Sequence, residues 1–298
     1  MNRHETAAGA PVKAAPPSWG AHRARAMDGQ ALLRRMVGDC LAQVEPNAEA
    51  LLRGSEDPEH VHQLRVGLRR LRSAVRGMAP FAGGLPARWE DAVTPVFDAL
   101  GDARDRHVLA TTLTPKLRRA GAPLAALGDA SGEGARGVYA HVSDAAFQAL
   151  LHELRRFADG SQDSPRHGRP GDGLAHLVRR LHKLSRQVTH AAKDFTELPF
   201  DDQHRARNRL KRLRYLAEFA APAFDRDAVQ AWLRAAQPAQ DALGKHVDHA
   251  LAGRRFEALA ARDPRAWFAV GWLRAKGERS GRAARKALKR LREAKAFW

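Results

Sequence analysis

Apolar residues recur at every third or fourth position along most of the chain, and this spacing constrains the fold more than any other feature. The pattern begins at Ala26 and runs through segments such as Ala31–Leu52, Val61–Met78 and Trp89–Leu100, with Gly or Pro at most of the breaks. Such spacing places apolar side chains on one face of an α-helix. Strand-like alternation with β-branched residues is absent, so the sequence predicts an all-α protein.

A polar segment divides the chain almost in half. Residues 158–173 (ADGSQDSPRHGRPGDG) are rich in Gly and Pro and are typical of a linker. Further helical segments follow it, namely Leu174–Ala192, Asp202–Ala221, Ala228–Leu243, Leu251–Ala261 and Arg279–Lys295. Residues 1–25 lack periodicity and are expected to form a disordered tail. We therefore expect two four-helix-like bundles, in residues 26–157 and 174–298.

The two predicted halves contain a shared motif. Residues 61–75 (VHQLRVGLRRLRSAV) align with residues 203–217 (QHRARNRLKRLRYLA) at an offset of 142. The identical pairs are His62/His204, Arg65/Arg207, Leu68/Leu210, Arg70/Arg212, Leu71/Leu213 and Arg72/Arg214, and Arg69/Lys211 keeps its charge. Downstream, Asp98–Gly101 matches Asp241–Gly244 and Asp105 matches Asp248 at an offset of 143. The halves are therefore expected to be duplicates related by an approximate two-fold axis.

Positive charge is concentrated in three stretches that contain no acidic residue. The chain has 51 Lys and Arg against 33 Asp and Glu, a formal charge of +18. Residues 60–89 hold six basic residues, residues 203–217 hold six and residues 279–292 hold seven, so the remainder is nearly neutral. A local excess of this kind indicates an anionic partner or surface.

The basic residues of the paired motif form a column on each helix. His62, Arg65, Arg69, Arg72 and Arg76 each follow an apolar residue of the predicted core stripe by one position, and His204, Arg207, Lys211 and Arg214 repeat the column. A single charged column is usually a solvated face, but such faces alternate in sign because like charges one turn apart repel. An external anion would compensate both columns, and the planar guanidinium suits bidentate contact with phosphate.

The histidines allow other interpretations, which we consider weaker than anion binding. Each column contains one histidine, and no second metal-ligating residue lies one helical turn away. A single histidine is too few ligands for a metal site, so we expect no bound metal and no cofactor. His246, Asp248 and His249 form a denser cluster, which is expected to lie solvated on a short loop. Leu100–Asp105 (LGDARD) is expected to be a helix boundary or a tight interhelical contact, with Asp102 or Asp105 bridging to arginines of the basic column.

Motifs of catalysis are weak or missing. Gly132–Gly137 matches GxGxxG but follows no predicted strand and is interpreted as a loop. No Walker A, HExxH, GxSxG or CxxC pattern occurs, so we expect a protein that is not an enzyme. Cys40, the single cysteine, is expected to be a buried and inert thiol. With no signal peptide and no run of about 18 apolar residues, we expect a cytoplasmic protein that does not enter the membrane.

The paired motifs resemble those of the CHAD domain, the conserved-histidine α-helical domain. The resemblance rests on Glu59–Ser73 (EHVHQLRVGLRRLRS), on His204–Tyr215 (HRARNRLKRLRY) and on the LGDARD stretch, and it covers about residues 26–298. It implies two helical bundles around a basic channel that binds inorganic polyphosphate, and an association with polyphosphate granules. A departure is His107, where family members often have an aspartate, and the role of that segment stays open.

Carried over to this sequence, the resemblance assigns polyphosphate binding to both columns. Arg70, Arg212 and Tyr215 match as neighbours of the columns, and Arg285, Lys286, Lys289 and Arg292 of the last helix are expected to extend the channel. Family members often accompany a triphosphate-tunnel domain, but no tunnel motif of alternating Glu precedes the domain here. Nucleic acid is the alternative polyanion. The columns lack interleaved aromatic residues for base stacking, since only Tyr215 is adjacent.

Overall fold

The computed structural model describes residues 9–17, 19–123, 131–160 and 169–298, and within them it contains helices and no strand. These residues fall into two compact units. The first holds residues 9–17, 26–110, 131–160 and 169–174, and the second holds residues 19–25, 111–123 and 175–298. The all-α prediction is therefore confirmed. The duplication of the two halves stays a prediction.

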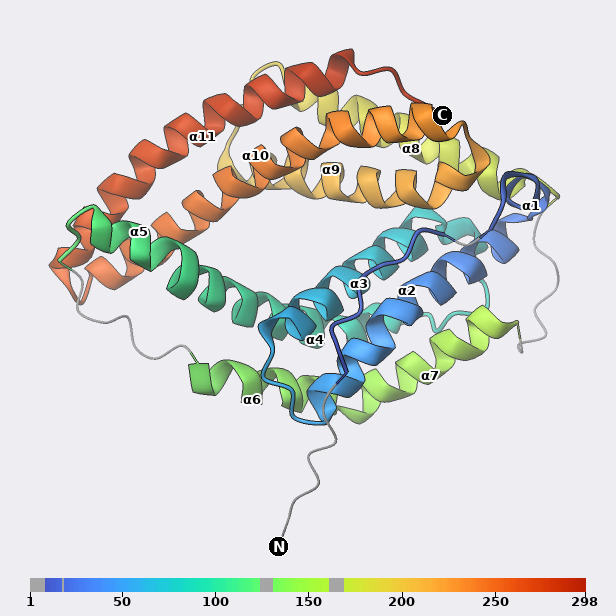
Figure 1. Cartoon of the computed structure of the whole chain (residues 1–298), viewed down its shortest axis with the longest axis horizontal. Helices are drawn as coiled ribbons and strands as arrows, with labels where there is room; N and C mark the ends of the chain where they lie inside the picture. The colour runs from blue at the N-terminus through green and yellow to red at the C-terminus, as the bar shows by residue number, and fades with distance from the viewer. Residues whose placement is uncertain (1–8, 18, 124–130, 161–168) are drawn as a thin grey trace, which may run out of the picture. The chain divides into compact units, whose positions relative to one another are not determined.

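The first unit is built on a pair of helices, α2 (Gly29–Leu52) and α3 (Pro58–Gly77), which pack against each other (Figure 1). Helix α4 (Trp89–Val108) packs against α3, while α6 (Ser131–Val142) and α7 (Ala145–Asp159) complete the unit against α4 and α2. A short 3-10 turn, η1 (Ala79–Phe81), follows α3. The core of this unit lies between α2 and α3, where residues such as Leu33, Met36, Leu64 and Leu68 have no more than 1% of their surface exposed.

Local sequence signals explain where several of these helices begin and end. Asp28 accepts a hydrogen bond from the Ala31 N–H at 2.8 Å and caps α2, and Asp57 caps α3 in front of Pro58. Asp144 caps α7, which ends at Gly160 in the left-handed conformation with φ 76°. These caps explain why the predicted helix starts near residues 31 and 61 lie within a few positions of the observed ones.

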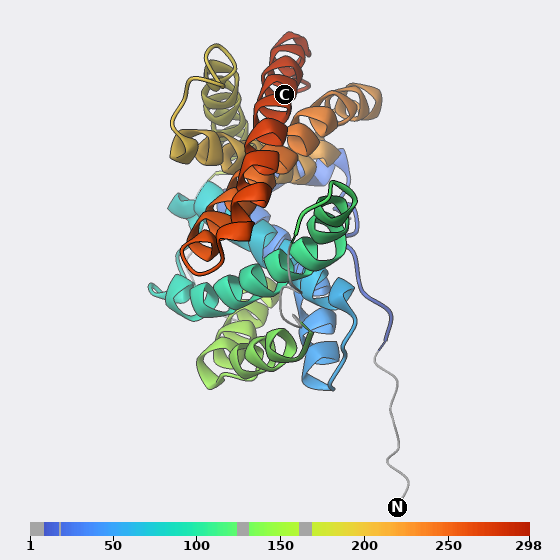
Figure 2. The ribbon, with the colours of Figure 1, turned by 90° about the vertical axis from the view of Figure 1, so that its left-hand side faces the viewer.

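The second unit contains the longest helices of the chain. Helices α8 (Asp172–Ala191) and α9 (Phe200–Ala220) are followed by α10 (Arg226–Ala260) and α11 (Trp267–Glu293). Helices α10 and α11 run antiparallel and are joined by the 3-10 turn η4 (Pro264–Ala266), as Figures 1 and 2 show. The unit also includes α1 (Ala21–Ala26), α5 (Thr114–Arg119) and the 3-10 turn η3 (Ala221–Ala223), and a π-helical turn (Leu109–Leu113) precedes α5.

The C-terminal residues of this unit close its core with aromatic contacts. Phe297 and Trp298 pack edge to face against Trp232 of α10, with ring centroids 5.9 Å and 4.9 Å apart. Trp298 also contacts His182 of α8 at 6.2 Å. Because these contacts join α8, α10 and the terminal residues, the last four residues are an ordered part of the fold.

The prediction of a disordered tail over residues 1–25 was wrong for its described part. The buried side chain of Asn47 pairs with the backbone of Val12 in both directions, at 3.3 Å and 2.8 Å, and the Gly9 carbonyl lies 2.9 Å from His60 Nε2. Trp19 is buried, and Arg25 of α1 donates to the Ala223 carbonyl at 2.9 Å. Burial of the indole and satisfaction of Asn47 offset the entropy of ordering. Residues 1–8 and 18 lie outside the described residues.

Three further segments are helical where the sequence predicted breaks. Residues Leu100–Asp105 lie inside α4 rather than at a boundary, and Gly101 of this stretch makes the alternative, an interhelical contact, with Arg65 of α3. Gly132–Gly137 lies within α6 rather than in a loop. The predicted break between Leu243 and Leu251 is absent because α10 is continuous through it. The predicted linker 158–173 is partly confirmed, since α7 ends at Asp159 and α8 begins at Asp172, while residues 161–168 are outside the described part.

Candidate functional site

The first column lies on α3 beside the buried apolar stripe, as the residue spacing predicts. Leu64, Leu68 and Leu71 have no exposed surface, and they anchor the helix to its unit. The column residues occupy the next position around the helix, where His62, Arg65, Arg69 and Arg72 are half-buried and Arg76 is exposed. The helix therefore presents its cations along one edge of the core rather than on a fully solvated face.

An aromatic ring from α4 lies under three arginines of this column. The guanidinium carbons of Arg65, Arg69 and Arg72 lie 5.3, 5.4 and 5.0 Å from the centroid of the half-buried Phe97 ring. These distances are typical of cation–π contacts. Sequence reasoning missed Phe97, because nothing in the order of residues places this helix position opposite the column.

The first column also has an acidic partner on α4. Glu90 accepts from Arg76 Nε at 2.7 Å and lies 3.6 Å from Arg72 Nη2. The hydrogen bond from Arg76 lowers the pKa of Glu90 below its usual range and raises the pKa of Arg76. An external anion is therefore not the column's only compensation, because the facing helix supplies a carboxylate at its Arg76 end.

Arg70 does not belong to the exposed column. Its side chain is 2% exposed, on the face of α3 that meets α2, and its Nη1 donates to Gln43 Oε1 at 3.3 Å. The charge of Arg70 acts on two neighbours in α2. Burial raises the pKa of Asp39 to about 6 and that of Cys40 to about 12, and Arg70 opposes both shifts. Arg70 is thus a core residue, and Cys40 is the buried thiol that the sequence predicts.

The second column lies on α9 with the same relation to the core. His204, Arg207, Lys211 and Arg214 are half-buried beside the buried Ala206, Leu210 and Leu213. The neighbours Arg212 and Tyr215 are half-buried as well. This column faces polar groups of α10, because Arg207 Nη2 lies 3.5 Å from Asp248 Oδ1 and Arg214 Nη1 donates to Gln237 Oε1 at 2.6 Å.

Carboxylates therefore accompany the second column too. Arg214 donates from Nε to Glu218 one turn along α9 at 2.9 Å. Asp248, which the repeat pairs with Asp105, takes the bridging role that the sequence predicted for an aspartate of the LGDARD stretch. At the position that the repeat pairs with Phe97, α10 carries Gln240. The two columns thus share their spacing but differ in the groups that support them.

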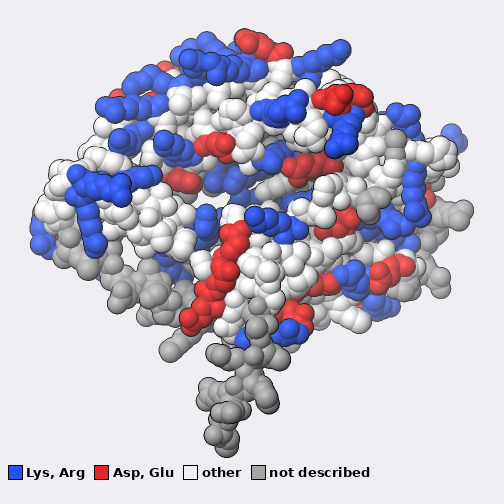
Figure 3. Space-filling model, in the orientation of Figure 1, with Lys and Arg blue, Asp and Glu red and all other residues white. Residues whose placement is uncertain are grey.

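The third basic set lies on the outer face of α11. Arg285, Lys286, Lys289 and Arg292 are all exposed, and within the described part of the chain no ion pair joins them to a carboxylate. Lys and Arg side chains gather over this helix in Figure 3. At the start of the same helix, Trp267 and Phe268 are 55% and 40% exposed, two of the three large apolar side chains with such exposure among the described residues.

The histidine cluster is buried in the middle of α10 and not on a solvated loop. His246 and His249 are 9% and 7% exposed, whereas Asp248 points toward the second column. Gln203 of α9 donates to the Phe195 carbonyl at 3.0 Å, so its Oε1 accepts from His246 Nε2 at 2.8 Å. Ser280 Oγ of α11 lies 3.3 Å from His246 Nδ1 and 3.2 Å from His249 Nδ1. The Gly277 carbonyl lies 3.1 Å from His246 Nδ1 and accepts from Ser280 Oγ at 3.0 Å.

Both histidines are held in the neutral form. Burial lowers the pKa of His246, and burial together with Lys245, His246, Lys116 and Lys276 lowers the pKa of His249 to about 4. The cluster joins α9, α10 and α11 through hydrogen bonds to Gln203 and Ser280. In the described residues, no group of three or more His, Cys, Asp or Glu side chains could hold a metal ion.

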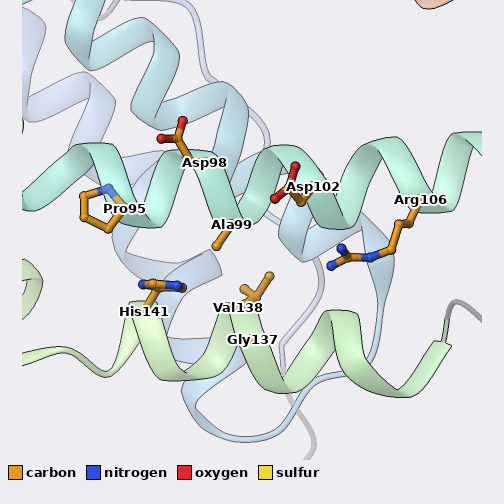
Figure 4. Close-up of a pocket in the computed structure, with 8 residues that line it drawn as sticks. All are labelled: Pro95, Asp98, Ala99, Asp102, Arg106, Gly137, Val138 and His141. Carbon is orange, nitrogen blue, oxygen red and sulfur yellow. The ribbon is translucent and has the colours of Figure 1, made fainter. Parts of the chain in front are cut away.

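A pocket of about 360 Å³ lies between α4 and α6, away from the column (Figure 4). Its lining includes Asp98, Asp102 and Arg106 of α4 and His141 of α6. These α4 positions are on a different face from Phe97, which contacts α3. None of the residues predicted to bind an anion lines this pocket, and its two carboxylates disfavour a polyanion there.

Comparisons with known proteins identify the family and agree with the fold. The family model described as CHAD domain matches residues 35–257. The crystal structure of the CHAD domain from the plant Ricinus communis is similar with a TM-score of 0.72 and 24% sequence identity, over 94% of this chain and 96% of that one. No curated protein matches the sequence. None of the helices in the described part combines the length and apolarity needed to cross a bilayer.

Proposed function

Because the chain belongs to the CHAD domain family, we propose that it binds inorganic polyphosphate along its basic columns without chemical turnover. The family supports a general polyphosphate-associated role. The proposal adds that the ligand lies in a basic channel, in contact with the α3 and α9 columns and with the outer face of α11. It also places the protein in the cytoplasm, at polyphosphate granules.

The observation that carries the proposal is the arginine cluster of α3. Arg65, Arg69 and Arg72 are gathered around one ring, with each guanidinium carbon within 5.4 Å of its centroid. Arginine can bind phosphate oxygens through two parallel N–H donors, and a row of such groups matches a ligand with a phosphate at every repeat. A linear phosphate polymer fits this row better than an isolated anion, because one chain can contact all three arginines.

A fourfold substitution tests the proposal. Replacement of Arg65, Arg69, Arg207 and Lys211 by Ala should reduce polyphosphate affinity at least about 100-fold at low salt, because four cationic contacts are removed. Helical content measured by circular dichroism should remain, since these side chains are off the apolar stripe. The matched control replaces four basic residues outside the columns, Arg23, Arg88, Arg118 and Arg262, and should bind nearly as the parent does.

Two results would contradict the proposal. The first is unchanged polyphosphate affinity in a folded fourfold variant, which would show that the columns do not hold the ligand. The second is release of phosphate from polyphosphate during long incubation with Mg²⁺, which would show an enzyme rather than a binding protein.

A nucleic-acid ligand is the second candidate, and one observation favours it. Trp267 and Phe268 are exposed at the start of α11, and the exposed Arg265 lies two residues before Trp267. Exposed rings next to cations are typical of proteins that stack single-stranded bases and bind their phosphates. If this surface binds single strands, a Trp267→Ala/Phe268→Ala variant will lose affinity for single-stranded DNA and keep its affinity for polyphosphate.

A further inference from the structure

The face of α4 that meets the first column has an unusual composition. Glu90, Phe97 and Gly101 follow one another along this face, and each meets a different part of the column on α3. Glu90 binds Arg76 and Arg72, the ring of Phe97 underlies Arg72, Arg69 and Arg65, and Gly101 lies against Arg65. The order of these contacts shows that α4 runs antiparallel to α3 and supports the column along its length.

Gly101 leaves room for Arg65, the arginine nearest the N-terminus of α3 in the column. A Cβ atom at this position would lie 3.3 Å from Arg65 Nη2, closer than most Cβ contacts, and 3.8 Å from Arg65 Nε. Gly101 is one helical turn beyond Phe97, so the bare backbone extends the surface on which the guanidinium rests. At Gly244, the residue that the repeat pairs with Gly101, a Cβ would meet nothing within 4 Å.

The ring also constrains how the arginines present their donors. Three guanidinium carbons within 5.4 Å of one centroid lie within about 11 Å of one another. A planar guanidinium can rest its face on an aromatic ring and also make a bidentate contact with an anion along its edge. The side chain also loses less conformational entropy on binding when it is already held.

We propose that Phe97 is the positioning residue of the polyphosphate site: its ring gathers Arg65, Arg69 and Arg72 so that one phosphate chain can bind all three. The inference rests on the proposed function. It also makes the α3 column the stronger of the two, because the α9 column has Gln240 at the paired position. Phe97 acts through the arginines and does not itself bind phosphate.

The test compares Phe97→Leu with Phe97→Tyr in the full chain, with long-chain polyphosphate as the ligand. Leu keeps an apolar side chain but removes the π face, so polyphosphate affinity should fall about tenfold. Tyr keeps the ring, so its affinity should stay within about twofold of the parent. The matched control is Gln240→Ala, which should leave affinity unchanged. Thermal unfolding should show that all variants are folded.

Salt dependence separates positioning from charge. Phe97→Leu keeps every cation, so its affinity should be lower at all salt concentrations with an unchanged slope of log affinity against log salt. Arg65→Ala removes a phosphate contact and should make the slope shallower. A merely structural role for Phe97 would lower the unfolding temperature and would not be rescued by Tyr.

The outcomes distinguish the inference from the proposed function. If the parent binds polyphosphate and the Arg65→Ala/Arg69→Ala/Arg72→Ala variant does not, the site is established whatever Phe97 does. Phe97→Leu binding like the parent, or Phe97→Tyr binding as weakly as Phe97→Leu, would then overturn the positioning role alone. A parent protein that does not bind polyphosphate at low salt would overturn the proposed function, and the inference with it.

Discussion

Arg69 and Arg70 are adjacent in the sequence but have different surroundings. Arg69 is half-buried at the edge of α3 and lies over Phe97, whereas Arg70 is 2% exposed and donates to Gln43. A rotation of about 100° between neighbouring helix positions accounts for the difference. The two guanidinium groups therefore have separate places, one at the edge that we propose to bind the anion and the other in the α2–α3 interface.

Alanine substitution should separate these roles. Arg70→Ala leaves a cavity and removes the charge that partly offsets Asp39, so the free energy of unfolding should fall by about 3 kcal/mol. Arg69→Ala should change it by less than about 0.5 kcal/mol and should weaken polyphosphate binding instead. Urea unfolding of both variants measures the first effect and polyphosphate titration the second. Equal destabilisation by the two substitutions would contradict this assignment.

Among the helices, α10 and α11 depend on a buried polar contact. His246 and His249 of α10 meet Ser280 of α11, and His246 Nε2 donates to Gln203 Oε1 of α9. Both rings are neutral in the fold, because burial lowers their pKa values. Acid should therefore weaken the packing of these helices before it affects helices without such a cluster.

The packing of α10 against α11 should lose stability between pH 6.5 and pH 4. The unfolded chain binds a proton at His249 below its usual pKa of 6.5, while the folded chain does so only near pH 4. The contribution of His249 to the free energy of unfolding, about 3 kcal/mol, should be lost across this window. Because the raised pKa of Asp39 acts in the opposite direction over the same range, the effect of His249 is measured as the difference between the parent and a His249 variant. His249→Asn keeps a donor near Ser280 but cannot titrate, so the variant should show a smaller fall. If the free energies of unfolding of the parent and of His249→Asn change with pH in parallel, His249 is not the group that titrates.

The sequence predicts helices and their core stripes well, because a period of 3.6 residues is a local property. It predicts the columns on α3 and α9 for the same reason. It misses Phe97, Glu90 and Gln237, because their proximity to the columns depends on how separate helices pack. It also misplaces His246 and His249, since a cluster of polar residues inside a buried helix resembles a loop until its partners Gln203 and Ser280 are known.

The chain as a whole combines a nearly neutral background with three basic stretches. Its formal charge is +18, and 19 of its basic residues lie in residues 60–89, 203–217 and 279–292. Polyanion binding should therefore weaken linearly in a plot of log affinity against log salt, because bound phosphates release their counterions. Loss of four column cations should reduce the slope by about 3. An unchanged slope would place the bound polymer elsewhere on the protein.

The most direct test of the central claim is a competition measurement with the full chain at one fixed salt concentration. Labelled polyphosphate is bound first, and unlabelled polyphosphate, single-stranded DNA and double-stranded DNA are added at equal phosphate concentrations. We expect unlabelled polyphosphate to displace the label at a concentration at least about tenfold lower than either nucleic acid. Equal displacement by nucleic acid would contradict it and would show a site that recognises charge alone.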